Sequence, residues 1–81
     1  MHTPRTRMAL LRCREVLAQA EVSDELRGLA EELLDRLLGM HDAQRLNGPV
    51  FLLALDSLDL VPGLQASVQA LRAAVLREVD A

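Results

Sequence analysis

The chain of 81 residues contains no tryptophan, no tyrosine and a single phenylalanine, Phe51. Its core must therefore be built from aliphatic side chains, and leucine is the most abundant of these. A leucine-rich core without aromatic anchors packs adequately, but it specifies one arrangement of its elements weakly. Because small domains of this kind often gain stability by self-association, we expect this chain to form a homodimer.

Cysteine is scarce as well, since Cys13 is the only one in the sequence. An internal disulfide is therefore impossible, and the cysteine usage does not indicate an oxidising compartment. The longest apolar run, Val50 to Leu55, is far shorter than the roughly 20 residues that a membrane-spanning helix needs. Near the N-terminus, Arg12 interrupts a short apolar run, which makes a poor secretion signal. We therefore predict a cytoplasmic protein.

Lysine is absent, so all nine basic residues are arginine. Residues 1–14 contain four arginines and no acid, whereas residues 15–81 contain five arginines and twelve acids. The net charge of −3 therefore combines a basic N-terminus with an acidic body. With 51% hydrophobic residues, the chain has enough apolar material for a core, which excludes intrinsic disorder.

The few prolines and glycines mark the ends of helices. Thr3-Pro4 is typical of a helix start, Ser23 of an N-cap, and Asn47-Gly48-Pro49 of a break. Gly39 lies inside the second apolar pattern, and we expect the helix to continue through it. The expected helices cover residues 4–20, 24–46, 49–59 and 62–79.

Apolar residues recur at steps of three and four, which is the helical period. In the first helix they place Leu10, Cys13 and Leu17 on one face. Residues 50–55 are apolar on every side, so the third helix is either central or covered by another chain. These patterns predict one all-α domain over residues 1–81, a small four-helix bundle completed or extended by homodimerisation. The narrow apolar seam of the fourth helix is Leu64, Val68, Leu71, Val75 and Val79.

Side chains that could support catalysis are few. Cys13 with His41 as its base would be one nucleophilic arrangement, but Cys13 shares an apolar helix face with two leucines, and we expect it to be buried. The four glycines are dispersed, so no glycine-rich phosphate loop is present. We predict no enzymatic activity and no small-molecule substrate.

Metal binding is not indicated either, because the sequence has no CxxC, no HExxH and no Glu-x-x-His pattern. The acidic residues of the second helix are more simply a solvated face, with Arg27–Glu31 and Glu32–Arg36 spaced to form ion pairs. We predict neither a metal nor a cofactor.

Asp56-Ser57-Leu58 resembles the Asp-Ser-Leu motif of acyl carrier proteins. The resemblance implies a carrier-protein-like domain, with a phosphopantetheine arm attached to Ser57. In that family the serine starts the second helix and two more helices follow, whereas only 24 residues follow Ser57 here. The residues alone favour a polar end of the third helix, with Asp56 and Asp59 facing water.

The basic N-terminus supports an alternative function, that of a small DNA-binding regulator. In a helix-turn-helix arrangement the second helix would present Asp24 and Glu25 to DNA, and these would be repelled by phosphate. Binding would then use the N-terminal arm alone. The other interpretation is a solvated basic end that offsets the acidic second helix, within the chain or across a dimer. The basic residues of the arm are Arg5, Arg7, Arg12 and Arg14.

The abundance of leucine and the lack of catalytic groups favour a non-enzymatic protein–protein interaction module. Such a module could be a small adaptor, a chaperone-like escort or an inhibitor of a larger bacterial or phage-targeted machine. Apolar side chains would supply affinity and acidic ones would steer a basic partner. The predicted apolar contacts are Phe51, Leu52, Leu55, Leu64, Val68 and Leu71. The predicted acidic contacts are Glu31, Glu32 and Asp35.

Overall fold

The computed structural model describes residues 5–80, except for the side chain of Asp80. These residues form four α-helices and no strand. The cap predicted at Thr3-Pro4 lies outside the described residues. The helices are α1 (Arg5–Gln19), α2 (Asp24–Asp42), α3 (Gly48–Leu58) and α4 (Gln65–Asp80).

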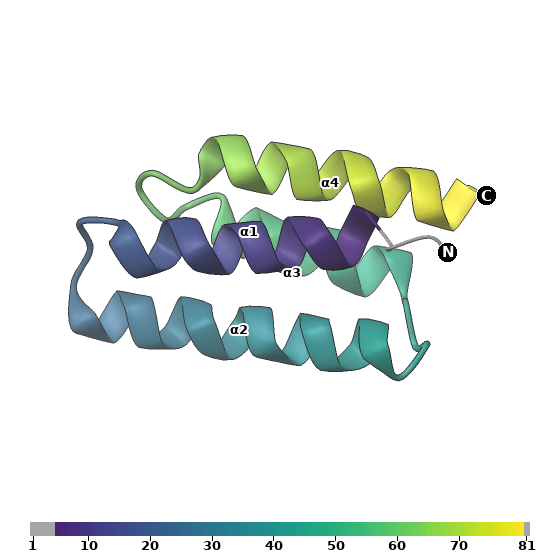
Figure 1. Ribbon diagram of the computed structural model, residues 1–81, viewed down its shortest axis with the longest axis horizontal. Coiled ribbons are helices and arrows are strands. Elements are labelled where there is room, and N and C mark those ends of the chain that lie inside the picture. The colour runs from purple at the N-terminus through teal and green to yellow at the C-terminus, as the bar shows by residue number, and fades with distance from the viewer. Residues whose placement is uncertain (1–4, 81) are drawn as a thin grey trace.

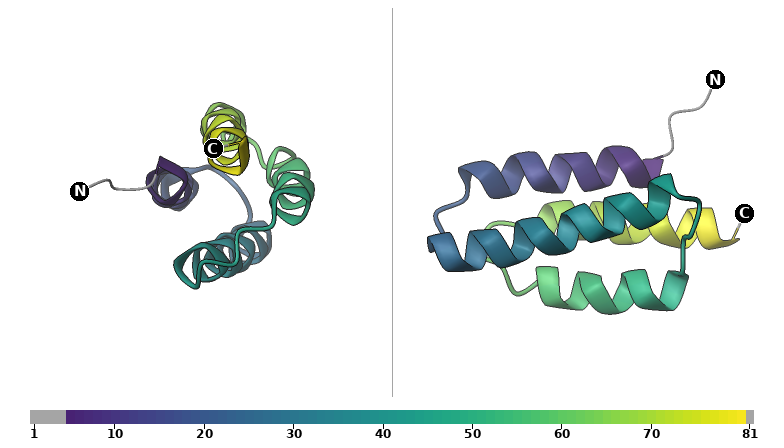
Figure 2. Two further views of the ribbon diagram at one scale, coloured as in Figure 1. Left: turned by 90° about the vertical axis from the view of Figure 1, so that its right-hand side faces the viewer. Right: turned by 90° about the horizontal axis from the view of Figure 1, so that it is seen from below.

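Successive helices run in opposite directions along the long axis of the molecule (Figure 1). Viewed end on, they surround the core in the order α1, α4, α3, α2 (Figure 2). The described part measures 37 × 21 × 18 Å along its principal axes. The prediction of an all-α, small four-helix bundle is therefore confirmed.

The core is made of one inward stripe from each helix. In α1 the stripe is Leu10, Cys13 and Leu17, as the helical period predicts. Val79, which was expected to extend the stripe of α4, is instead half exposed at the end of the bundle. The remaining buried hydrophobic residues of this cluster are Ala30, Leu34, Leu37, Phe51, Leu55, Leu58, Val61, Leu64, Val68, Leu71 and Val75.

The helices do not pack equally against one another. α1 lies closely along α4 and along α2, and α3 lies along α4, but α2 and α3 approach each other at few points. The well-packed pairs therefore form an open series, in the order α2, α1, α4, α3. The seam between α2 and α3 is the weakest in the bundle.

Two helix starts are capped by side chains, and the sequence indicates the one at Ser23. The Ser23 hydroxyl accepts a hydrogen bond from the Leu26 amide at 3.1 Å, and the Asn47 side chain accepts one from the Val50 amide at 3.2 Å. Each bond satisfies an amide that has no partner within its own helix. α2 also runs through Gly39 without a break, as predicted.

α2 ends at Asp42, four residues before the expected end. The chain turns at Gln44, which has a φ of 59°, and the Gln44 amide donates to the His41 carbonyl at 3.0 Å. The next amide, Arg45, donates to the Met40 carbonyl at 2.8 Å. This pair of bonds defines a Schellman motif. The sequence does not indicate this motif, because glutamine occupies the left-handed position where glycine is usual.

α4 begins at Gln65, three residues after the expected start. Val61, Pro62, Gly63 and Leu64 form a turn closed by a 3.2 Å bond from the Leu64 amide to the Val61 carbonyl. Proline at the second position and glycine with a φ of 87° at the third are the residues that a type II turn requires. The Gln65 side-chain amide then donates to two carbonyls of this loop, at 3.1 Å each.

Arg27 joins the end of α1 to α2. Its guanidinium donates to the carbonyls of Leu17 and Ala20, the latter at 2.8 Å. A cation at these carbonyls is favourable because they form the negative end of the α1 dipole. The predicted Arg27–Glu31 ion pair is therefore replaced by a cap on the neighbouring helix, and that part of the prediction was wrong.

Two ion pairs link α1 to α2. Arg7 lies 3.0 Å from Asp42, and Arg14 lies 2.7 Å from Asp35. The two arginines are seven residues apart on α1 and the two aspartates are seven residues apart on α2, in reverse order. Both pairs therefore fit one antiparallel register of the two helices.

We expect Gln44→Gly to stabilise the fold, because glycine adopts a positive φ without the steric cost that a β-carbon adds. The expected gain is about 1 kcal/mol, which raises the melting temperature of a domain this small by about 4–8 °C. Thermal unfolding followed by circular dichroism measures it.

Gly63→Ala is the matched control, because it places a β-carbon at a position with a φ of 87°. It should lower the melting temperature. An unchanged or lowered melting temperature for Gln44→Gly would show that the left-handed turn is not strained.

A candidate protein-binding surface

Five of the six apolar residues that were predicted to contact a partner are fully buried in the core of this chain. Side chains in these positions cannot reach another protein while the bundle is folded. The remaining residue, Leu52, is half-buried. We therefore assign the five to the core and look for a binding surface among their exposed neighbours. The five buried residues are Phe51, Leu55, Leu64, Val68 and Leu71.

α3 lies at the periphery of the bundle, on the side opposite α1 (Figure 2). It is therefore not the central helix that its all-apolar sequence allowed. Its outward side exposes Val50 and Leu53, of which 45% and 71% is accessible, and Leu60 directly after the helix is 82% accessible. No charged residue occurs between residues 48 and 55. The first eight residues of α3 therefore add no charge to this side of the bundle.

The apolar surface continues from α3 onto α2. A shallow groove of about 160 Å³ runs between the two helices, and Leu29, Leu33, Ser57 and Val61 are among the residues that line it. Leu29 stands at its edge with 61% of its surface accessible. The groove is smaller than the roughly 300–1,000 Å³ of ordinary small-molecule pockets, so it is better suited to a protruding side chain than to a ligand.

On its other flank α3 meets the C-terminal end of α4. A β-carbon placed on Gly48 would lie 3.1 Å from the nearer methyl group of Val79, so these two helix ends are in close contact. Leu76 and Val79 are 45% and 50% accessible. We call the combined exposed surface the α3 face. Its members are Leu29, Val50, Leu53, Leu60, Leu76 and Val79.

Two ion pairs lie beside the α3 face. Arg72 of α4 lies 3.1 Å from Asp56 of α3, and Arg36 lies 2.9 Å from Glu32 on α2. The second pair is the i,i+4 contact that the sequence predicts. Exposed pairs like these add little stability, but each cancels its own charge.

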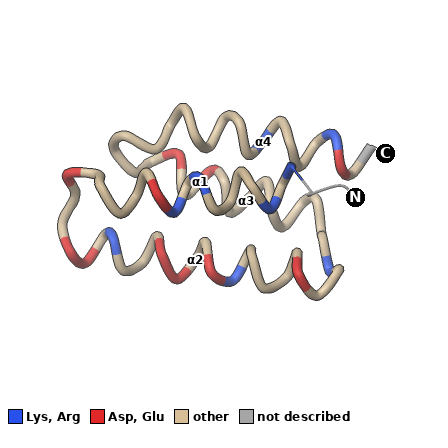
Figure 3. The backbone as a smooth tube through the Cα atoms, in the orientation of Figure 1, with Lys and Arg blue, Asp and Glu red and all other residues tan. Residues whose placement is uncertain are grey.

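The three acidic residues that were predicted to steer a partner are not arranged as one patch. Acidic residues occur along the whole of α2 (Figure 3). However, Asp35 pairs with Arg14 of α1, and Glu32 pairs with Arg36 of the same helix. Glu31 is partly buried. The acidic character of α2 is therefore partly neutralised by arginines of the same chain.

The four arginines of the predicted nucleic-acid arm do not gather on one side of α1. Arg7 and Arg14 pair with carboxylates of α2. Arg5 instead lines a hollow with Arg77 of α4, and Arg12 lies in another with neighbouring residues of α1. For Arg7 and Arg14 the structure confirms the interpretation that the basic end offsets the acidic second helix within the chain.

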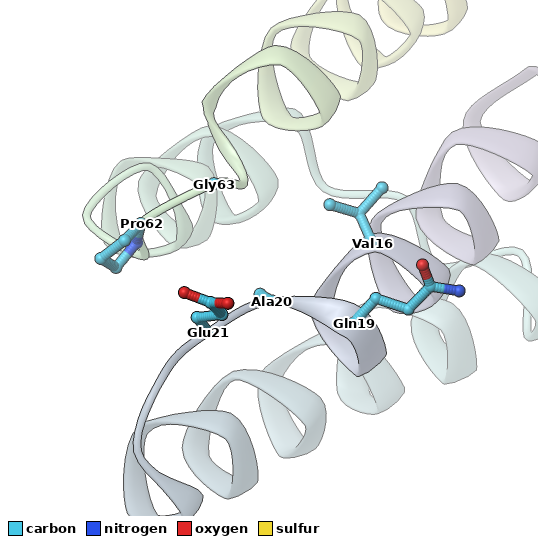
Figure 4. Close-up of a pocket in the computed structure, with 6 residues that line it drawn as sticks. All are labelled: Val16, Gln19, Ala20, Glu21, Pro62 and Gly63. Atoms are coloured by element: carbon cyan, nitrogen blue, oxygen red, sulfur yellow. The ribbon is translucent and has the colours of Figure 1, made fainter.

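A wide hollow of about 510 Å³ lies at the end of the bundle, between the C-terminal end of α1 and the turn before α4 (Figure 4). Its polar side chains are the Gln19 amide and the Glu21 carboxylate, and Glu21 lies beside Pro62 across the opening. The lining contains neither a nucleophile nor a histidine, so no reaction is indicated there.

Ser57 is exposed in the last turn of α3, at the edge of the groove with α2. The resemblance to acyl carrier proteins implies a serine at the start of a helix. The position of Ser57 in this fold therefore departs from that pattern, and the carrier-protein alternative gains no support from the geometry.

Cys13 and His41 take part in separate contacts. Cys13 is fully buried, and burial raises the pKa of its thiol from 9.0 to about 11. His41 instead joins α2 to α4, because its Nε2 atom lies 3.0 and 3.1 Å from the two carboxylate oxygens of Glu78. A neutral buried thiol is a poor nucleophile.

Comparisons of this chain with protein-family models, with curated proteins and with solved structures found no match. Within residues 5–80, no helix combines the length and the apolar character that crossing a membrane requires. The described side chains contain no cluster of three histidine, cysteine or acidic residues that could hold a metal ion.

The raised pKa of Cys13 gives stability a specific pH dependence. In the unfolded chain the thiol ionises near pH 9, whereas in the folded chain it ionises near pH 11. The stability contributed by the neutral thiol is therefore complete below pH 9 and is lost as the pH rises through 11. We expect urea unfolding to show a drop in stability between these values.

Cys13→Ala is the control for this effect. Below pH 9 it should be less stable because it leaves a small cavity, but the thiol's share of the drop at higher pH should be missing. The same slope in both proteins, or rapid labelling of the folded protein by a thiol reagent at pH 8, would contradict a buried neutral thiol.

Proposed function

We propose that this chain is a protein–protein interaction module that binds through the α3 face. The observation that carries the proposal is the exposure of Leu53 and Leu60, at 71% and 82%, on a side of the bundle without charged residues between positions 48 and 55. Large apolar side chains that are exposed on the same side of a small protein often mark an interaction site.

Apolar burial supplies the affinity. Complete burial of one leucine side chain contributes about 1.5–3 kcal/mol, and Leu53 and Leu60 are mostly exposed before binding. The groove beside Ser57 accepts a side chain of the partner, while the two leucines insert into the partner's surface. This combination is typical of a helix that docks along a helix pair.

The acidic body contributes steering more than affinity. Glu32 and Asp35 already have arginine partners in the chain, so they offer a basic partner less than their number implies. We propose that this weak attraction speeds the encounter and is reduced by salt, whereas the apolar contacts are not.

The proposed role is non-enzymatic and cytoplasmic, and it includes the adaptor, the escort and the inhibitor as specific forms. One observation supports a role without catalysis. The Cys13 thiol, which is the nucleophile that the sequence offers, is buried and neutral. The homodimer that the sequence suggests is compatible with this role, because a second copy is itself a protein partner.

Leu53→Glu tests the proposal, because it places a charge at the centre of the α3 face at little cost to folding. We expect a co-purifying protein to be enriched with the native bait and reduced at least about tenfold with Leu53→Glu. A buried carboxylate without a partner costs far more than a lost leucine contact. Quantitative mass spectrometry of the eluates measures the ratio.

Met8→Glu is the matched control, because Met8 is 56% exposed on α1, away from the α3 face. It should retain the partner. Equal recovery with Leu53→Glu and with the native bait would sink the proposal. Recovery of nucleic acid that is lost in Arg5→Ala, Arg12→Ala would instead favour the DNA-binding alternative.

A further inference from the structure

We infer that the α3 face is occupied, in the absence of another protein, by a second copy of this chain whose α3 packs antiparallel to the first about a two-fold axis. The inference rests on the proposed function, because it names the first partner of the same surface. Three features of the described residues lead to it, namely the spacing, the sizes and the charges of the side chains on this face.

The outward residues of α3 and of the turn directly after it have a spacing that reads the same in both directions. They are Val50, Leu53 and Ser57 of the helix and Leu60 of the turn, separated by steps of three, four and three. Two such stripes in antiparallel orientation therefore match along their whole length. Val50 then lies opposite Leu60 of the second copy, and Leu53 lies opposite Ser57 of the second copy.

The sizes of the opposed side chains also match. Leu53 projects from the surface with 71% of its area accessible, whereas Ser57 is short and borders the groove between α2 and α3. A large side chain above a small one is the arrangement by which helices interlock. A parallel pair would instead place Leu53 against Leu53 and leave the two serines facing each other.

The charges permit this self-association. A two-fold axis brings identical surfaces together, so any unpaired charge at the rim would meet its own copy and repel it. Here Asp56 is paired with Arg72, and Glu32 is paired with Arg36. Because these two ion pairs cancel their own charges at the rim, we expect salt to change the dimer affinity only slightly.

The size of the surface sets the strength of the dimer. The α3 face has six exposed apolar side chains, whereas an interface of standard size involves about 20–30 residues on each side. We therefore expect a dimer of moderate strength, with a Kd of about micromolar. Such a dimer dissociates readily, which leaves the face available to a protein that binds it more tightly.

The oligomeric state tests the inference directly. Light scattering with refractive-index detection suits a chain without tryptophan or tyrosine. We expect the native chain to pass from the 8.9 kDa monomer to twice that mass as the concentration rises through the micromolar range. Leu53→Glu should raise the Kd at least about 30-fold, while Met8→Glu should leave it unchanged.

Leu60→Glu provides a second variant in case Leu53→Glu unfolds the chain. Leu60 lies outside α3 and is 82% accessible, so its replacement leaves the core intact. It should also weaken the dimer. A native chain that stays monomeric at several hundred micromolar, or a dimer that neither variant weakens, would overturn the inference.

Disulfide trapping tests the antiparallel orientation. Leu53→Cys and Ser57→Cys are prepared separately in a Cys13→Ala background, mixed, and oxidised with oxidised glutathione. The mixed disulfide should form at least about tenfold faster than either symmetric one, because the antiparallel register places residue 53 opposite residue 57. Predominance of the symmetric Leu53→Cys product would indicate a parallel pair and overturn the inference.

The two proposals can fail independently. A monomeric chain that still retains a foreign protein through Leu53 would leave the proposed function standing without the homodimer. A dimer that Leu53→Glu dissociates, combined with unchanged capture of the foreign protein by that variant, would leave the homodimer standing and place protein binding elsewhere.

Discussion

A helix in a four-helix bundle can bury only the side that faces its neighbours, and this limit governs the surface of the present molecule. α3 is apolar around its whole circumference, but it is short, peripheral and packed closely against α4 alone. Its inward side supplies Phe51, Leu55 and Leu58 to the core. Its outward side has no such neighbour among residues 5–80, and Leu53 is exposed as a result. The α3 face follows from this excess of apolar positions.

The electrostatic contacts provide specificity that a leucine-rich core lacks. Leucines pack acceptably in several helix arrangements, because their shapes differ little from one position to the next. The Arg7–Asp42 and Arg14–Asp35 pairs fit only one antiparallel register of α1 and α2. Each exposed pair contributes at most about 1 kcal/mol, so their effect is mainly to penalise shifted registers. The basic N-terminal segment thereby acquires a structural role.

Much of the fold could be predicted from the sequence, and the failures have physical causes. The Ser23 cap, the continuation through Gly39 and the inward stripe of α1 follow from local chemistry and from the helical period. The end of α2 was predicted four residues too late because Gln44 adopts a left-handed conformation, which is unusual for glutamine. Arg27 was misassigned because its acceptors lie on another helix.

Which residues of α3 are exposed was predicted less well than the fold. Where every position of a helix is apolar, periodicity cannot decide which side turns inward, so Phe51 and Leu55 were chosen over Leu53. That choice depends on where α4 and α2 lie, which is a tertiary property. The one available signal was the symmetric spacing of Val50, Leu53, Ser57 and Leu60, which becomes meaningful only once this side is known to face outward.

The open series of well-packed helices has a topological consequence. α2 and α3 are the two ends of that series, and the loop of residues 43–47 joins them covalently at the seam where packing is weakest. Side-chain packing is extensive along three sides of the bundle, whereas on the fourth side it is sparse and the loop joins the two helices at one end. A single cut in this loop would remove that connection while leaving α1 packed on α4. The bundle would then open along the α2–α3 seam.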